Sequence, residues 1–217
     1  MIKLLKHFYL PLIFGFIFSL LLLFITFPKF LLVDKILSQR GIYMTAKAVQ
    51  EKIFSLELKD VSLYDRNSKL MEFEKMNISI IPLSINLKGA SASGWVEINY
   101  YFLKKQYSIK ARNLKTLNLF TIQDANIELE RDIKGSLSIK NLNLSGLKLE
   151  SIILHFKGRT FDVKLQDKDT ESRGSGIITI SKDIFDSKLN SEVIYGGYRI
   201  IFSGTLKNLK IDAKPVL

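Results

Sequence analysis

The sequence predicts a mainly β protein: a single N-terminal transmembrane helix, a short amphipathic helix, and then a curved antiparallel β-sheet of groove or open-sandwich type. Three observations predict this order. Residues 8–27 carry no charge, residues 30–40 place apolar side chains at helical spacing, and the chain after about residue 42 consists of short alternating runs. With 217 residues, 47% of them hydrophobic, the chain is long enough for one core-forming domain and an anchor.

The uncharged segment FYLPLIFGFIFSLLLLFITF is typical of a membrane anchor. It has the ~20 residues that a helix needs to cross a hydrocarbon core. A removable signal peptide has a shorter apolar region of roughly 7–15 residues and a small-residue cleavage site, which Phe27-Pro28-Lys29-Phe30 does not offer. We therefore expect residues 1–28 to form a cytoplasmic tail and an uncleaved signal anchor. A buried soluble helix is the alternative.

The segment FLLVDKILSQR, residues 30–40, predicts a second, amphipathic helix. Its apolar positions 32, 33, 36 and 37 fall on one helical face, and Gly41 is a natural stop. We expect a linker helix over 29–41 that packs on the end of the sheet or lies on the bilayer. The domain over 42–217 is then a periplasmic β domain.

Short alternating runs separated by turn residues predict the strands. Gly196-Gly197 is the clearest two-residue hairpin turn, and residues 166–175 form the most polar loop. The predicted strands are 53–58, 61–64, 70–73, 76–81, 95–103, 107–111, 126–130, 136–139, 142–144, 147–156, 160–165, 176–180, 187–194 and 197–203.

One alternating stretch, SLELKDVSLYD at 55–65, breaks its own pattern. Leu56 and Leu58 share one face of an extended chain, but the polar pair Lys59-Asp60 moves the next apolar residues to the other face by parity. The same form, in which an apolar pair is followed by Lys or Arg, then Asp or Asn, and then a second apolar pair, recurs three times. The copies are at 137–144, 109–116 and 204–211.

An extra residue of this kind is what a β-bulge or a sharp strand bend supplies. Asp or Asn at the second polar position tolerates the unusual backbone conformation that this requires. The slip would return the second apolar pair to the side of the first, and would build a curved sheet with one continuous apolar face. The alternative is a plain turn between short strands. The residues predicted to form this apolar groove or core face are Leu56, Leu58, Val61, Leu63, Leu137, Ile139, Leu142 and Leu144.

Several segments in order resemble the type II secretion system protein N family (GspN), in its AsmA-like form. They are the anchor running into Phe27-Pro28, the helix ending at Gly41-Ile42, FSLELKDVSLYD at 54–65, MNISIIPLSI at 76–85, and FSGTLKNLKID at 202–212. The resemblance implies an inner-membrane protein with a periplasmic β domain that assists an export or pilus-like apparatus. AsmA-type relatives and the lipopolysaccharide-transport protein C carry lipid along an apolar β groove.

The sequence offers no constellation for catalysis. There is no cysteine, no metal-ligand spacing, no G-x-S-x-G and no phosphate-binding loop, and His155 is a lone histidine within a strand. We therefore predict no enzyme, no catalytic residue, no cofactor and no metal. The net charge of +11 comes from lysines scattered singly along alternating strands, which is typical of solvated faces and not of a nucleic-acid site.

Two functions follow from these patterns. The first is an accessory or assembly subunit of a type II secretion or related pilus-like system, acting by protein–protein binding. The alternative is a lipid-binding or lipid-transfer module with an apolar β groove. In both, the partners are the membrane, other secretion subunits or lipid, and the location is the bacterial inner membrane with the C-terminal domain in the periplasm.

Overall fold

The computed structural model contains one open antiparallel sheet of 14 strands and two helices among the residues that it describes. These residues are 2–39, 41–65, 68–81, 83–116, 120–144, 147–167, 171–181, 186–205 and 208–216. At 2–10, 21, 24, 143, 144, 147, 148, 208 and 209 the backbone alone is described. The mainly β fold with antiparallel pairing is therefore confirmed.

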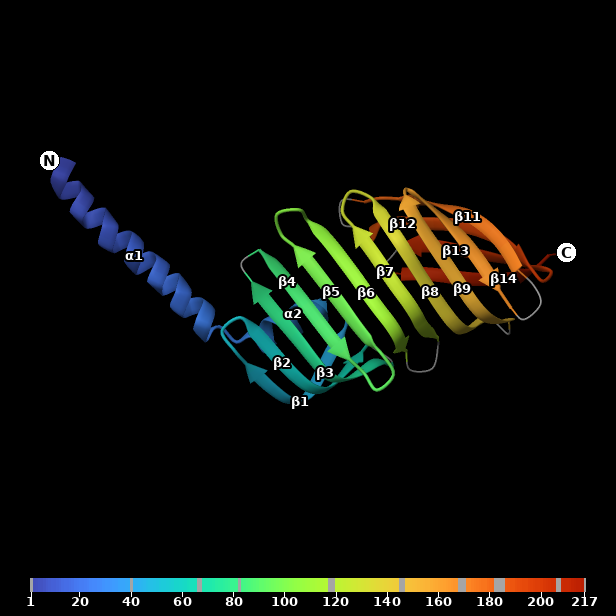
Figure 1. Cartoon of the computed structure of the whole chain (residues 1–217), viewed down its shortest axis with the longest axis horizontal. Helices are drawn as coiled ribbons and strands as arrows, with labels where there is room; N and C mark the ends of the chain where they lie inside the picture. The colour runs from blue at the N-terminus through green and yellow to red at the C-terminus, as the bar shows by residue number, and fades with distance from the viewer. Residues whose placement is uncertain are drawn as a thin grey trace.

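The elements follow one another along the chain without a crossover. The helices are α1 Ile2–Thr26 and α2 Lys29–Gln39. The strands are β1 Tyr43–Glu51, β2 Ser55–Tyr64, β3 Lys69–Ile81, β4 Ser84–Ala90, β5 Trp95–Tyr101, β6 Gln106–Lys115, β7 Thr121–Leu129, β8 Ile133–Leu144, β9 Leu147–Gly158, β10 Thr160–Gln166, β11 Glu171–Thr179, β12 Lys188–Tyr195, β13 Tyr198–Thr205 and β14 Asn208–Pro215. Each strand pairs with the strands before and after it, so the sheet is a single meander with β1 and β14 at its edges (Figure 1).

Helix α1 extends away from the sheet (Figure 1). Where its side chains are described they are exposed, including Leu12, Phe14 and Phe16. Over the described residues, no helix reaches both the length and the hydropathy needed to cross a membrane.

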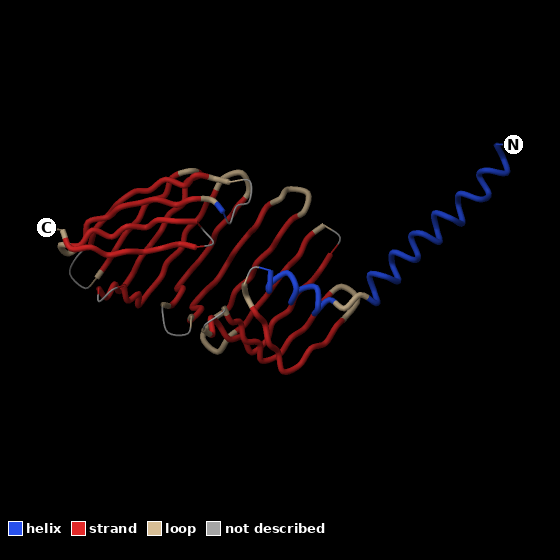
Figure 2. Tube along the Cα trace, turned by 180° about the vertical axis from the view of Figure 1, so that it is seen from behind, coloured by secondary structure: helices blue, strands red, loops and turns tan. Residues whose placement is uncertain are grey.

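Helix α2 packs against the first strands of the sheet, as Figure 2 shows. Phe30, Val33 and Leu37 lie on one helical face and contact the buried residues of the sheet. At its start, the carboxylate of Glu51 on β1 accepts hydrogen bonds from the backbone N–H groups of Lys29 and Phe30, both at 3.0 Å. A carboxylate at this position satisfies free N–H groups of the first turn and complements the helix dipole.

The predicted stop of this helix at Gly41 is confirmed. Gly41 has a φ of 76°, which glycine adopts without a steric penalty. Its N–H donates to the carbonyl of Ser38, and the N–H of Ile42 donates to the carbonyl of Leu37, both at 3.0 Å. These two bonds close the helix in the manner of a glycine C-cap.

Because α1 extends away from the sheet, a chain lacking residues 1–28 is expected to remain folded. Its far-UV circular dichroism should be that of a mainly β protein, and its thermal unfolding should stay cooperative. A spectrum dominated by helix, or the loss of a cooperative transition, would contradict the fold described above.

Several predicted strands prove to be parts of longer ones. Segments 53–58 and 61–64 belong to the single strand β2, 70–73 and 76–81 to β3, and 136–139 and 142–144 to β8. Strands β1, β4 and β14 were not predicted, and β11 begins at Glu171 inside the supposed polar loop. The Gly196-Gly197 hairpin is confirmed: both glycines have positive φ, and Tyr195 pairs with Tyr198 across the turn.

Three of the four slips lie inside continuous strands, and their second polar residue adopts a left-handed conformation. The φ angles are 49° at Asp60, 49° at Asn113 and 57° at Asn141. Asp and Asn tolerate this region better than other side chains. At Lys59-Asp60 both side chains are exposed, while Leu58 before them and Val61 after them are buried on the same face.

At Lys59-Asp60 the slip is a bend shared by β2 and β3 and not an inserted bulge residue, whereas the register of β7 and β8 does shift between Ile122 and Asp124. Lys59 pairs with Lys75 and Val61 with Phe73, so the register is unchanged across Asp60. It is unchanged because β3 has its own consecutive exposed residues, Glu74 and Lys75, at the same level. The fourth copy, at 204–211, does not lie inside one strand: β13 ends at Thr205, β14 begins at Asn208, and 206–207 lie outside the described residues.

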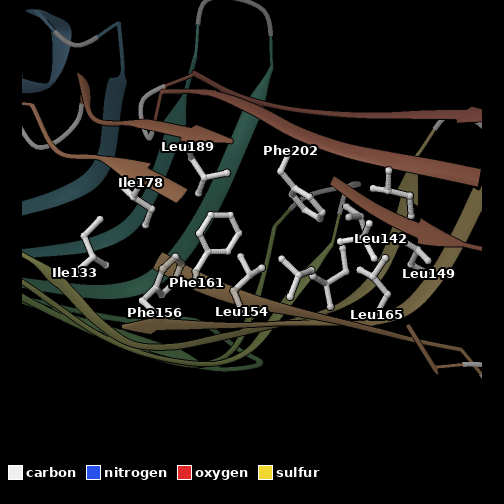
Figure 3. Packing of buried hydrophobic residues seen from close by; sticks show 14 of the residues in the cluster. Ile133, Leu142, Leu149, Leu154, Phe156, Phe161, Leu165, Ile178, Leu189 and Phe202 are labelled. Carbon is white, nitrogen blue, oxygen red and sulfur yellow. The ribbon is translucent and has the colours of Figure 1, made fainter. Parts of the chain in front are cut away.

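The sheet has an inner face, which carries the buried residues and contacts α2, and an outer face, which is polar. The inner face has two hydrophobic clusters. The N-terminal cluster lies beneath α2 and includes Leu56, Leu58 and Phe73. The C-terminal cluster is enclosed by the sheet itself, because β14 contacts β8 although five strands lie between them. Phe161 and Phe202 lie among its fully buried residues (Figure 3).

Candidate functional site

A transverse row of apolar residues crosses the inner face and changes in exposure along its length. From β2 to β10 it consists of Leu56, Ile78, Leu87, Ile98, Ile109, Ile127, Gly135, Phe156 and Phe161, each directly opposite the next. The row is buried on β2 and β3, half-buried from β4 to β7, and buried again on β9 and β10. The two ends are covered, by α2 and by the curl of the sheet, and the middle is not.

The uncovered middle of the inner face is contiguous across four strands. We call it the middle apolar patch. Its residues are Ile85, Leu87, Ile98, Tyr100, Tyr107, Ile109 and Ile127, all of them half-buried. At one border the rings of Tyr100 and Tyr107 stack with centroids 4.5 Å apart. Side chains of this kind pack well on a pleated face, and here water still reaches them.

The residues predicted from the slip lie on the inner face, but most of them are buried, either under α2 or where the sheet curls over itself. Leu56, Leu58 and Val61 are at most 1% exposed, and Leu63 packs beside them in the N-terminal cluster. Leu142 is buried in the C-terminal cluster.

Two further predicted residues, Leu137 and Ile139, are half-buried at the C-terminal cluster, and Leu137 contacts both clusters. The side chain of Leu144 lies outside the described residues. The predicted set is thus divided between two cores and does not form one site.

The middle apolar patch was missed because its exposure depends on tertiary structure. Its strands β5, β6 and β7 overlap the predicted runs 95–103, 107–111 and 126–130, whose alternation indicated an inner and an outer face. The alternation could not indicate that α2 stops short of them. In β4, the run Ile85, Leu87, Gly89 has the period of a strand but ends in a glycine, which weakened the signal.

The outer face is polar and carries ion pairs. Lys157 pairs with Asp162 at 2.7 Å, and its hydrogen bond and charge lower the pKa of Asp162. Lys164 and Arg173 likewise lower the pKa of Glu171. His155 is exposed on this face. Exposed pairs of this kind contribute little to stability.

No group of three or more histidine or acidic residues that could hold a metal ion occurs among the described residues. The arrangement that stands out is therefore the middle apolar patch. Its aliphatic side chains pack against the N-terminal cluster on one side and the C-terminal cluster on the other, and they remain partly exposed as an apolar surface.

No family model matches the chain, and no solved structure matches it. A protein of Aquifex aeolicus (strain VF5), described as an uncharacterized protein, is 34% identical to it over 203 residues. The matched region covers 93% of this chain and 92% of that protein, so the similarity extends over most of both chains. The chain belongs to the same family as this Aquifex aeolicus protein.

Proposed function

We propose that the protein is a membrane-anchored lipid-binding protein whose middle apolar patch receives acyl chains. The single observation that carries the proposal is the change in exposure along the transverse row, which is buried at both ends and half-exposed over β4–β7. Burying apolar surface stabilises a complex by about 25 cal/mol per Å². A flexible aliphatic chain laid across Leu87, Ile98 and Ile109 would cover the part of the row that the protein leaves open.

The anchor belongs to the same proposal. Residues 8–27 contain no charged side chain, and the exposed apolar residues of α1 suit a lipid environment. In this arrangement the chain is held in the bacterial inner membrane and the sheet lies in the periplasm. The resemblance to AsmA-type proteins, which carry lipid along an apolar β groove, agrees with this function.

A second candidate is an assembly subunit of a type II secretion or related pilus-like system. The observation that favours it is the open sheet, since β1 and β14 each have only one neighbouring strand. Unpaired backbone groups at such edges can accept a strand from another protein. The resemblance to the type II secretion system protein N family agrees with this candidate.

Site-specific photocrosslinking in cells tests the first proposal against the second. A benzophenone amino acid at Ile98 or Ile109 is expected to give lipid adducts in mass spectrometry. Lys110 is the matched control, because it follows Ile109 on β6 and is exposed on the outer face. Leu58, which is 1% exposed, is the buried control.

Equal lipid labelling from Ile109 and Lys110, or no lipid from Ile98 and Ile109, would contradict lipid binding by the patch. Adducts with other proteins from Lys47 on the β1 edge, in the absence of lipid adducts from Ile98, would support the assembly function instead.

A further inference from the structure

The outer face of strands β2–β5 contains a hollow of about 480 Å³, a volume within the usual range for a small-molecule site. Two outward rows of residues flank it, one through Glu57 and Lys88 and the other through Lys59 and Trp95. Its lining includes Glu57, Lys59, Lys75, Ala90, Trp95 and Glu97. The side chains of Leu58, Met76 and Val96 point to the inner face, so that the backbone of their row forms the floor.

The hollow exists because a small residue interrupts a row of large ones. One row runs across four neighbouring strands, each residue directly opposite the next: Lys59 on β2, Lys75 on β3, Ala90 on β4 and Trp95 on β5. The methyl group of Ala90 leaves open the space that its long neighbours enclose. Trp95 borders this space and is 42% exposed, so its ring face is accessible.

Lys59 and Lys75 lie directly opposite each other on β2 and β3, and both side chains are exposed. Like charges directly opposite each other on antiparallel strands destabilise the pair. Within the described residues neither lysine forms an ion pair. The neighbouring Asp60 pairs instead with Lys47 at 3.4 Å.

The two carboxylates of the hollow are engaged by other groups. Glu57 pairs with Lys52 at 2.5 Å, and Glu97 pairs with Lys88 at 3.5 Å. Burial raises the pKa of Glu97. Hydrogen bonds from Asn99 and Asn86 and the charge of Lys88 lower this pKa by more, so the net result is a pKa below the usual value of a glutamate. Glu97 is therefore a charged acceptor already held by its neighbours. Asp60 and Glu74 lie beside Lys59 and Lys75 at the bend, but among the described residues no carboxylate forms an ion pair with either lysine.

We infer that this hollow binds a phosphate ester, with the phosphate between Lys59 and Lys75 and the polyol or sugar part against the ring of Trp95. Lysine ammonium groups bind phosphate as point charges, and an exposed indole offers an apolar face with a polar edge. Such a ligand can be the head group of a membrane lipid or a free phosphate ester. The site lies on the face opposite the middle apolar patch, so its occupancy does not depend on acyl-chain binding there.

Trp95 is the one tryptophan in the chain, so its fluorescence reports on the hollow itself. The full chain in a polyoxyethylene detergent would be titrated with glycerol phosphate, glucose 6-phosphate and dihexanoyl phosphatidylglycerol, with octyl glucoside as the uncharged probe. At least one phosphate ester is expected to give a saturable change in emission, and octyl glucoside none. Replacing both Lys59→Gln and Lys75→Gln should raise the apparent Kd about tenfold or more.

The double variant Lys134→Gln and Lys157→Gln is the matched control. These lysines also lie directly opposite each other, on β8 and β9, and the change in charge is the same. It should shift the Kd less than about twofold. The Lys59 and Lys75 variant should keep its melting temperature, because the substitution removes a repulsion.

A response to soluble esters as strong as that to the lipid would identify a free phosphate ester as the ligand, and a response to the lipid alone would identify a lipid head group. Both support the site. The inference is overturned by the absence of a saturable change with every phosphate ester, by an equal response to octyl glucoside, or by an equal loss of affinity in the control variant. None of these results alters the crosslinking expected from Ile98.

Discussion

Replacing Phe161 with alanine is expected to lower the free energy of unfolding by about 3–5 kcal/mol. Phe161 is fully buried in the C-terminal cluster, with its ring centroid 6.0 Å from that of Phe156. The ring also fills the space that a side chain at position 176 would need, because a Cβ built on Gly176 would lie 2.2 Å from the Phe161 ring. Truncation therefore leaves a cavity lined by two strands, which close packing makes costly.

The contact between Phe161 and Gly176 makes this prediction testable by a double-mutant cycle. Gly176→Ala alone should cost about 1–3 kcal/mol through overpacking, and less once Phe161→Ala has removed the ring, although the added Cβ would still lie 2.6 Å from the Cβ of Ser191. Urea unfolding of the two single variants and the double variant measures the coupling. Purely additive effects would contradict the close approach of the Phe161 ring to Gly176. Leu103→Ala, at a side chain 79% exposed, is the control expected to change little.

Deleting Asn141 is expected to lower the free energy of unfolding by about 2–3 kcal/mol. The register of β8 and β9 is continuous across this residue, with Lys140 opposite Ser151 and Leu142 opposite Leu149. Without Asn141, β8 would have one outward residue at the bend where β9 has two. Either Leu142 would leave its buried position or β9 would have to form a bulge.

A compensating deletion distinguishes the effect of the disrupted register at the bend from the effect of losing one residue. Removing Glu150 from β9 as well as Asn141 restores equal lengths, and the double deletion should be more stable than the single one. The substitution Asn141→Gly, which keeps the length and suits a φ of 57°, should have only a small effect. A melting temperature unchanged by the single deletion would show that the bend does not set the register.

The local features of the fold could be predicted from the sequence. Alternation predicted strands, the spacing of residues 30–40 predicted α2, and Asp60, Asn113 and Asn141 were recognised as positions for an unusual backbone conformation. These features depend on a few neighbouring residues, so they can be inferred without tertiary structure. The same pattern misled at 204–211, because Lys-Asn is equally suited to a turn between two strands.

The candidate site could be predicted only in part. The inner apolar face followed from alternation, but its division into covered and uncovered parts depends on where α2 ends and where the sheet closes on itself. The hollow beside Trp95 required the register of four strands, which places Ala90 between Lys75 and Trp95. A single sequence gives the residues of each strand but not which of them lie opposite one another.

The meander has a consequence for how the protein folds. Each strand pairs only with strands adjacent in the chain, so most backbone contacts close short loops and the contact order is low for a β protein, which favours fast folding. All residues of the N-terminal cluster except Leu137 precede Ile127 in the chain. During synthesis from the N-terminus they therefore leave the ribosome before the residues that enclose Phe161. The N-terminal end of the sheet can thus form its strand pairs and be covered by α2 while the C-terminal end is still being translated.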